Sequence, residues 1–253
     1  MATEDKSLVA KYDALYENEA MAGDLEVEPV QVVGWPADRN QALVYLARPG
    51  GRLLEIGCGR GGVLATLAPR FDEVVGSELS AVRAERTRRA LAHVPNCTIL
   101  NQPLETLAET AKPPFDCIVW ADVIEHVADV IGAMQTLARL SKPGTQLVTV
   151  TPNVAFLPQR LNILRGRAPN TASPWCPNEG FLPDPDQTVL LDAGHLHYFT
   201  FRQVEMLYSI AGFRPERRLG IGTRFGRWRN RWPTLLSGLV CISGTFHPKS
   251  GRP

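Results

Sequence analysis

The sequence predicts an α/β fold in which helices cover both faces of a doubly wound, mostly parallel sheet. Short apolar runs that end in small residues alternate with longer segments of helical periodicity, which is the pattern of βα units. The runs are dense in Val, Ile, Leu and Phe, as expected for strands buried on both faces. With 253 residues and 44% hydrophobic content, the chain can bury one sizeable core, so we expect a single domain over residues 1–253.

Five strands are expected in the first 151 residues. They lie at residues 52–56, 73–75, 97–100, 115–120 and 146–151. The apolar run at 235–242 is the candidate for the last two strands, although arginine and glycine residues around it obscure their ends.

Three helices are expected between the strands, at residues 81–92, 123–140 and 201–211. Ser80 and Thr200 precede the first and the third, where a hydroxyl can accept from a free backbone N–H of the first turn. The second helix is expected to end before Lys142-Pro143-Gly144, because proline cannot continue a helix and glycine favours a turn.

Two segments lie outside this alternation. Residues 1–50 are expected to form an N-terminal helical segment. Between residues 153 and 198 the pattern is interrupted by six prolines, which predicts an irregular lid insertion on the substrate side of the domain.

The overall charge excludes two classes of protein. The 27 Lys and Arg residues balance 26 Asp and Glu residues, which favours neither disorder nor a globally basic nucleic-acid binder, so we expect no nucleic-acid partner. The charge is uneven, however. From Arg214 to the end, nine Lys or Arg residues accompany a single acid, Glu216.

The expected compartment is the cytoplasm. The five cysteines are scattered without CxxC spacing, which suits a reducing environment. The first residues, MATEDKSLVA, contain acids and no apolar core of a signal peptide. No apolar run approaches the ~20 residues that span a bilayer, so no stable membrane insertion is expected.

A glycine-rich turn follows the first expected strand. Gly57 permits a tight turn, and Gly59 lets a ligand approach the backbone without meeting a Cβ. Together with Gly62 they match the G-x-G-x-x-G fingerprint of dinucleotide sites, a pattern that is weak when it stands alone.

Two acids favour a different nucleoside. Glu55 precedes Gly57 by two residues, where a carboxylate repels the pyrophosphate of NAD but attracts an ammonium group. Glu78 ends the second strand, where its two oxygens can accept from a ribose diol. A nucleoside that carries an amino acid and no phosphate, namely S-adenosylmethionine, satisfies both acids.

Four ordered segments resemble class I S-adenosylmethionine-dependent methyltransferases, and they read LLEIGCGRGG, VVGSELS, FDCIVWADVIEHV and LSKPGTQLVTVTPN. The resemblance implies a Rossmann-like, seven-stranded doubly wound sheet with the last strand antiparallel, and S-adenosylmethionine as cofactor. The residues that it implies for cofactor binding are Glu55, Gly57, Cys58, Gly59, Glu78, Leu79, Gln102, Pro103, Ala121 and Asp122. Gln102 departs from the family, which often has an acid near adenine, but a carboxamide can still accept from the exocyclic amine.

The first candidate for acceptor chemistry is D-x-x-E-H at Asp122, Glu125 and His126. On one helical face these side chains could hold a divalent cation or position His126 as a base. The segment resembles ubiquinone-biosynthesis O-methyltransferases, some of which use a metal there. The competing interpretation is that Glu125 and His126 only cap and pack the helix, and no metal is assigned.

The second candidate is the segment from Asp192 to Thr200. In an extended chain His195 and His197 would point the same way, with Tyr198 opposite. The segment resembles methyltransferases related to the MetW group and to sugar or lipid tailoring enzymes. His195 is therefore the first choice as catalytic base, with His126 second, although a histidine among apolar neighbours is often a structural, hydrogen-bonded residue.

A third segment combines aromatic and basic residues. Phe225, Trp228 and Trp232 lie among four arginines, an arrangement that could grip an anionic or aromatic acceptor or touch a membrane surface. The alternative is a solvated loop with packed aromatics.

The function expected from these features is O-methylation of a small metabolite, glycan or lipid-linked intermediate, in a biosynthetic role. N-methylation of an amine is the first alternative. A non-catalytic S-adenosylmethionine-binding subunit that regulates a partner enzyme is the second, and an NAD-dependent oxidoreductase is opposed by Glu55. The expected partner is a small-molecule acceptor, and a homodimer is possible.

Overall fold

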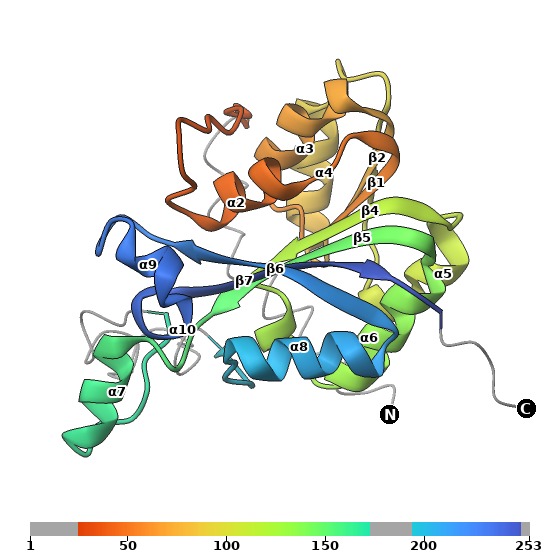
Figure 1. Ribbon diagram of the computed structural model, residues 1–253. Coiled ribbons are helices and arrows are strands. Elements are labelled where there is room, and N and C mark those ends of the chain that lie inside the picture. The colour runs from red at the N-terminus through yellow and green to blue at the C-terminus, as the bar shows by residue number, and fades with distance from the viewer. Residues whose placement is uncertain (1–24, 173–193, 249–253) are drawn as a thin grey trace, which may run out of the picture.

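The computed structural model describes residues 25–172 and 194–248, which form a seven-stranded sheet with helices on both faces (Figure 1). The strand order is β3-β2-β1-β4-β5-β7-β6. The strands are β1 (Gly50–Ile56), β2 (Phe71–Ser77), β3 (Cys97–Leu100), β4 (Phe115–Ala121), β5 (Ser141–Pro152), β6 (Phe213–Ile221) and β7 (Leu239–Phe246). β1 to β5 pair in parallel, whereas β7 is antiparallel to both β5 and β6. The doubly wound sheet with an antiparallel last strand is thereby confirmed.

The helices divide between the two faces. They are α2 (Arg39–Leu46), α3 (Gly62–Leu67), α4 (Ala81–Ala90), α5 (Leu107–Thr110), α6 (Val130–Arg139), α7 (Leu157–Leu164), α8 (Phe201–Ile210), α9 (Trp228–Arg231) and α10 (Pro233–Leu236). In Figure 1, α2, α3 and α4 lie above the sheet, and α6 and α8 lie below it. α5 packs in the same apolar cluster as α6 and α8. Within the described residues, no helix is both long and apolar enough to cross a bilayer.

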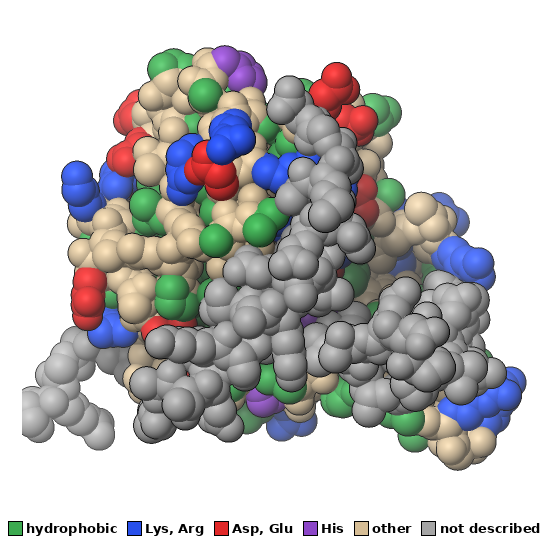
Figure 2. Space-filling view, turned by 180° about the vertical axis from the view of Figure 1, so that it is seen from behind, with side chains coloured by type: hydrophobic (Ala, Val, Ile, Leu, Met, Phe, Trp, Pro, Cys, Tyr) green, Lys and Arg blue, Asp and Glu red, His purple; other side chains and the backbone are tan. Residues whose placement is uncertain are grey.

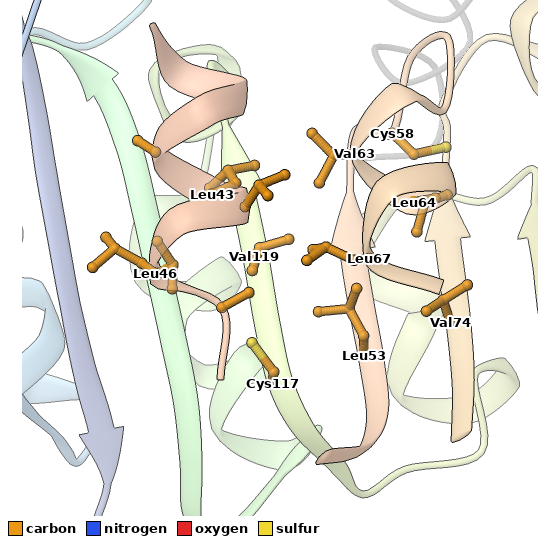
Figure 3. Packing of buried hydrophobic residues seen from close by; sticks show 14 of the residues in the cluster. Leu43, Leu46, Leu53, Cys58, Val63, Leu64, Leu67, Val74, Cys117 and Val119 are labelled. Carbon is orange, nitrogen blue, oxygen red and sulfur yellow. The ribbon is translucent and has the colours of Figure 1, made fainter. Parts of the chain in front are cut away.

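The sheet separates two apolar cores. Successive strand residues point to opposite faces, so Leu53 packs with α2 and α3 while Leu54 packs with α5, α6 and α8. Figure 3 shows the first core, in which Leu43 of α2 and Leu67 of α3 lie over Leu53 and Val119. Continuous apolar strands are therefore required, as the sequence indicated.

Polar caps set the starts of the longer helices. The side chain of Ser80 accepts from the Arg83 backbone N–H, and that of Thr200 accepts from the Gln203 backbone N–H. The Gln203 side chain in turn accepts from the Thr200 backbone N–H. Both caps were expected. The helices end at Ala90 and Ile210, close to the expected limits.

Two expectations about the elements were wrong. The helix expected at 123–140 is divided, because Asp122 adopts a positive φ of 52° and only a short 3-10 turn, Ile124–His126, precedes α6. Asp129 then caps α6 by accepting from the Gly132 N–H. The last two strands do not share the run at 235–242, since β6 lies in the arginine-rich stretch before it. Exposed charged residues fill the middle of the strand and its buried residues lie at the two ends, so no long apolar run marks the strand in the sequence.

The insertion is described in part. After β5 the chain forms α7, so residues 153–198 are not irregular throughout. Residues 173–193 of the insertion and residues 1–24 of the N-terminal segment lie outside the described part. The described part of that segment contains α2.

Candidate functional site

The glycine turn is anchored to the second strand. The backbone N–H groups of Gly57 and Cys58 both donate to the Ser77 carbonyl, at 2.8 and 3.0 Å. Gly57 has a φ of +71°, and a Cβ there would lie 2.6 Å from Cγ2 of Val123. Gly59 has a φ of +52°, and a Cβ there would meet no atom within 4 Å. Gly57 is thus required by packing, whereas the space before Gly59 is open.

Glu78 lies beside this open space. Its Oε2 accepts from the Gly59 N–H and its Oε1 from the Ser80 N–H, both at 3.0 Å. Each carboxylate oxygen can accept more than one hydrogen bond, so acceptor capacity remains for two hydroxyls. The backbone contacts hold the carboxylate against the glycine turn, where the ribose diol was expected.

Glu55 is a buried carboxylate for which the described part of the chain supplies no ion-pair partner. It is 5% exposed, and its Oε2 has no hydrogen-bond partner within the described residues. Burial, and secondarily the charge of Glu78, raise the pKa of Glu55 well above its usual value. Burying a carboxylate oxygen without a partner is unfavourable, so an ammonium group bound here would offset that energetic cost. The unpartnered Oε2 is thus the observation on which a fit of S-adenosylmethionine to these residues would rest.

The expected adenine region has a polar partner that the sequence reasoning missed. The amide nitrogen of Asn101 donates to the carbonyls of Glu78 and Leu79, at 2.9 Å each. Next to it, the Gln102 carbonyl accepts from the Ser77 hydroxyl at 2.9 Å, and the Gln102 side-chain oxygen accepts from Thr110. These bonds join the ends of β2 and β3, which orients the loop that carries Pro103.

Asp122 is held by a residue far away in the chain. Its backbone N–H donates to the Val150 carbonyl at 3.0 Å, and its carboxylate pairs with Arg39 of α2. Burial raises the pKa of Asp122, although Arg39 opposes the shift. Nothing in the sequence signals this pair, because 83 residues separate its members. Ala121 precedes Asp122 at the end of β4, so both lie at the carboxyl edge of the sheet beside the glycine turn.

Glu125 is the buried centre of the acceptor side. It is 1% exposed, its Oε2 accepts from the Thr151 hydroxyl at 2.9 Å, and its Oε1 has no partner within the described residues. Burial and the nearby Asp122 raise the pKa of Glu125 to about 7. Its backbone carbonyl accepts from the N–H groups of Leu196 and His197, at 2.8 and 3.2 Å. The turn after β4 therefore binds the end of the insertion directly.

That contact brings the two histidine clusters together. The rings of His126 and His195 are 4.9 Å apart between centroids, in an edge-to-face arrangement. His126 Nδ1 lies 3.2 Å from the Gly194 carbonyl, and His195 Nδ1 lies 2.6 Å from the Thr171 hydroxyl. The sequence predicted both histidines as separate candidates, and it did not predict that they form one site.

The metal-ligand grouping differs from the expected one. Glu125, His126 and His195 each offer a ligand atom, and these atoms lie within 4.8 Å of one another. Asp122 was expected on the same helical face as Glu125 and His126. This was wrong, because the left-handed turn at Asp122 removes it from the 3-10 turn and Arg39 occupies its carboxylate.

The remaining candidates are not members of the Glu125, His126 and His195 group. The His197 ring lies 6.1 Å from Phe199 between centroids, and its Nε2 is buried without a partner within the described residues. Tyr198 is 37% exposed. Trp228 and Trp232 stack on each other at the surface, with centroids 5.2 Å apart.

Comparisons with known proteins identify relatives. The sequence model of the methyltransferase domain family matches residues 35–217. Over 105 residues the chain is 33% identical to the ubiquinone biosynthesis O-methyltransferase of Alkalilimnicola ehrlichii, and this match covers 41% of the present chain and 42% of the relative. The match therefore spans less than half the length of that protein.

Solved structures share the fold. The YcgJ protein of Bacillus subtilis superposes with a TM-score of 0.55 at 15% identity, covering 82% of this chain and 97% of that one. Magnesium protoporphyrin IX methyltransferase of Synechocystis, solved with bound SAH, gives a TM-score of 0.55 at 17% identity and 82% coverage of both chains.

Proposed function

Since this chain belongs to the methyltransferase domain family, in the class I S-adenosylmethionine-dependent group, we propose that it methylates an oxygen atom of a small acceptor. The observation that carries the proposal is the contact between His126 and His195 above the buried Glu125. An oxygen acceptor must lose a proton, and a base at the acceptor side meets that need. The printed name of the Alkalilimnicola ehrlichii relative, an O-methyltransferase, supports the same acceptor atom.

Different residues are proposed to bind the cofactor and to transfer the proton. S-adenosylmethionine supplies an electrophilic methyl group on a sulfonium. Glu55 binds the ammonium group, and Glu78 accepts from the ribose hydroxyls. The turn at Asp122 and the packed histidines would help to position the acceptor for a near-attack geometry.

His195 is the proposed base. Bound S-adenosylmethionine would supply the methyl group to the acceptor oxygen, and the electron pair of its carbon–sulfur bond would stay on sulfur. The acceptor proton goes to the imidazole of His195, whose ring orientation is fixed by Thr171 at 2.6 Å. His126 packs against that ring, and ligand atoms of Glu125, His126 and His195 all lie within 4.8 Å of one another.

The test is an acceptor screen with purified protein and S-adenosylmethionine. Phenols and other hydroxyl compounds are compared with primary amines, and methylated products are identified by mass spectrometry. With the best hydroxyl acceptor, His195→Ala is expected to lower kcat by about 10²- to 10⁴-fold while the cofactor Kd stays within twofold. His195→Gln serves as a polar control of similar size and is expected to fail in the same way.

Three results would contradict the proposal. Full turnover in His195→Ala would remove the assignment of His195 as base, and full turnover in His126→Ala as well would remove the histidine pair from the proton transfer. Products formed from amines alone would favour N-methylation. Tight cofactor binding without turnover on any acceptor, recovered by addition of a second protein, would identify a regulatory subunit instead.

A further inference from the structure

A basic and apolar surface lies beside the acceptor side of the site. We define it as the basic-tryptophan surface, formed by residues 157–167, which include α7, and residues 224–232, which include α9. Figure 1 shows α7 projecting from the body of the protein on the same side as α9 and α10. The mechanism proposed above uses no residue of this surface.

Large apolar side chains on this surface face solvent. Leu164 is 82% exposed and Ile163 is 48% exposed at the end of α7, while Trp228 and Trp232 are 51% and 52% exposed. Exposed apolar side chains are common singly, but a group of this size on one face indicates an interaction site. The two segments are joined at their bases, where the rings of Phe156 and Phe225 meet edge to face with centroids 6.2 Å apart.

The charge of the surface has one sign. Seven arginines lie within it: Arg160, Arg165, Arg167, Arg224, Arg227, Arg229 and Arg231. All are exposed except Arg229, which is half-buried. Residues 154–172 and 222–238 contain no Asp or Glu. Among the described residues, no carboxylate forms an ion pair with Arg165, Arg167, Arg227 or Arg231. In Figure 2 basic side chains accordingly stand out at the edge where α7 and α9 lie.

The sheet places this surface at the same edge as the site. The α7 segment follows the carboxyl end of β5, and the α9 segment connects β6 to β7 at that end, since Pro152 of β5 pairs with Leu239 of β7. The Asn153 side chain fixes the connection by donating to the carbonyls of Thr234 and Ser237. A large partner bound here therefore faces the edge that carries Asp122 and Glu125.

We propose that the basic-tryptophan surface docks this protein on a membrane leaflet that contains anionic phospholipids. Arginines match the phosphates of such a leaflet, while tryptophan rings and short apolar projections enter the region between headgroups and acyl chains. Leu164 and Ile163 favour lipid over nucleic acid, because projecting aliphatic side chains add nothing to phosphate contacts. Trp228 and Trp232 stack on each other, so the facing sides of their rings cannot stack on nucleic-acid bases. Proteins that bind single-stranded nucleic acid instead present open aromatic rings to the bases.

The test is flotation of the full-length protein with vesicles of phosphatidylcholine alone or with 30% phosphatidylglycerol, a composition on the order of anionic cell membranes. We expect binding to the anionic vesicles that weakens with added salt, and little binding to the neutral ones. Arg227→Ala with Arg231→Ala is expected to weaken the partition coefficient about 25-fold, from about fivefold for each arginine. Ile163→Ser with Leu164→Ser is expected to weaken it at least tenfold.

Matched controls lie on another face. Arg202→Ala with Arg214→Ala removes two exposed arginines, and Met206→Ser with Ile210→Ser removes two exposed apolar side chains of α8. Both controls are expected to bind vesicles like the unchanged protein. Titration with S-adenosylmethionine reports folding of every variant, and it separates this inference from the proposed function, because cofactor affinity is expected to stay constant throughout.

Several outcomes would overturn the inference. Equal binding to neutral and anionic vesicles would remove the role of the arginines, and an unchanged partition of Ile163→Ser with Leu164→Ser would remove insertion. Failure to bind any vesicle, or retention by duplex or single-stranded nucleic acid alone, would assign the surface to another partner.

Discussion

Alanine substitutions at Gly57 and Gly59 are expected to impair different properties of the protein. The first should mainly lower its stability, and the second should mainly weaken cofactor binding. At Gly57, the new Cβ would lie 2.6 Å from Cγ2 of Val123 and would sit on a backbone with a φ of +71°. A left-handed conformation costs a residue with a Cβ about 1–2 kcal/mol, and an overpacked contact adds about 1–3 kcal/mol. Gly57→Ala should therefore lower the free energy of unfolding by about 2–5 kcal/mol.

At Gly59 only the conformational part applies. The φ is +52° and a Cβ would meet no atom of the protein within 4 Å, so the expected loss of stability is about 1–2 kcal/mol. The methyl group would instead occupy the space where the cofactor approaches the backbone. Gly59→Ala should consequently weaken S-adenosylmethionine binding by at least tenfold in a protein that is still folded.

The assay combines urea unfolding with calorimetric titration of S-adenosylhomocysteine. Val123→Ala added to Gly57→Ala should recover the overlap part of the loss but not the backbone part. An unchanged cofactor Kd in folded Gly59→Ala would refute the reasoning, because the open space would then not be cofactor space. A larger loss of stability in Gly59→Ala than in Gly57→Ala would refute the packing argument.

Three further predictions follow from buried polar groups. Glu55→Gln should raise the stability of the cofactor-free protein at neutral pH, because it removes an unpaired buried carboxylate, while weakening cofactor binding in the titration. The folded-state pKa of Glu125 is raised from its usual value to about 7, so its contribution to stability is present below about pH 4.5 and is lost as the pH rises through about 7. Urea unfolding across that range should show the free energy of unfolding falling as the pH rises. Glu125→Gln should make the free energy of unfolding depend less on pH. Asn153→Ala leaves the carbonyls of Thr234 and Ser237 without their donor, so thermal unfolding should report a loss of about 1–3 kcal/mol, whereas the exposed Asn230→Ala should change little.

The sequence predicted the sheet well because its signals are local. Strands buried on both faces are continuous apolar runs, and the helix starts at Ser80 and Thr200 carry their own cap residues. β6 was missed because exposed charged residues fill its middle and its buried residues lie at its ends, so the strand has no long apolar run. The helix expected at 123–140 was divided by the backbone at Asp122, and no composition rule signals a left-handed aspartate.

The grouping of the residues proposed to bind the cofactor was predictable for a related reason. Glu55, Gly57 and Glu78 lie at the ends of neighbouring parallel strands, and the carboxyl ends of such strands meet at one edge. Each residue is therefore placed by the element that carries it, and its position along the strand is sufficient. Arg39 and Asn101 act on the same site through side chains that reach across it, so their strand and helix positions alone did not identify them.

The acceptor side depends on a contact that no local rule supplies. His126 and His195 are separated in the chain by α6, β5 and most of the insertion, and they meet because the Glu125 carbonyl accepts from Leu196 and His197. That carbonyl is available because the chain after Asp122 forms a single 3-10 turn, whereas a longer helix would have used it internally. The break in the expected helix and the joining of the two histidine clusters are thus one structural event. Replacing Asp122 by a residue that disfavours positive φ should accordingly disturb His195 as well as the cofactor site.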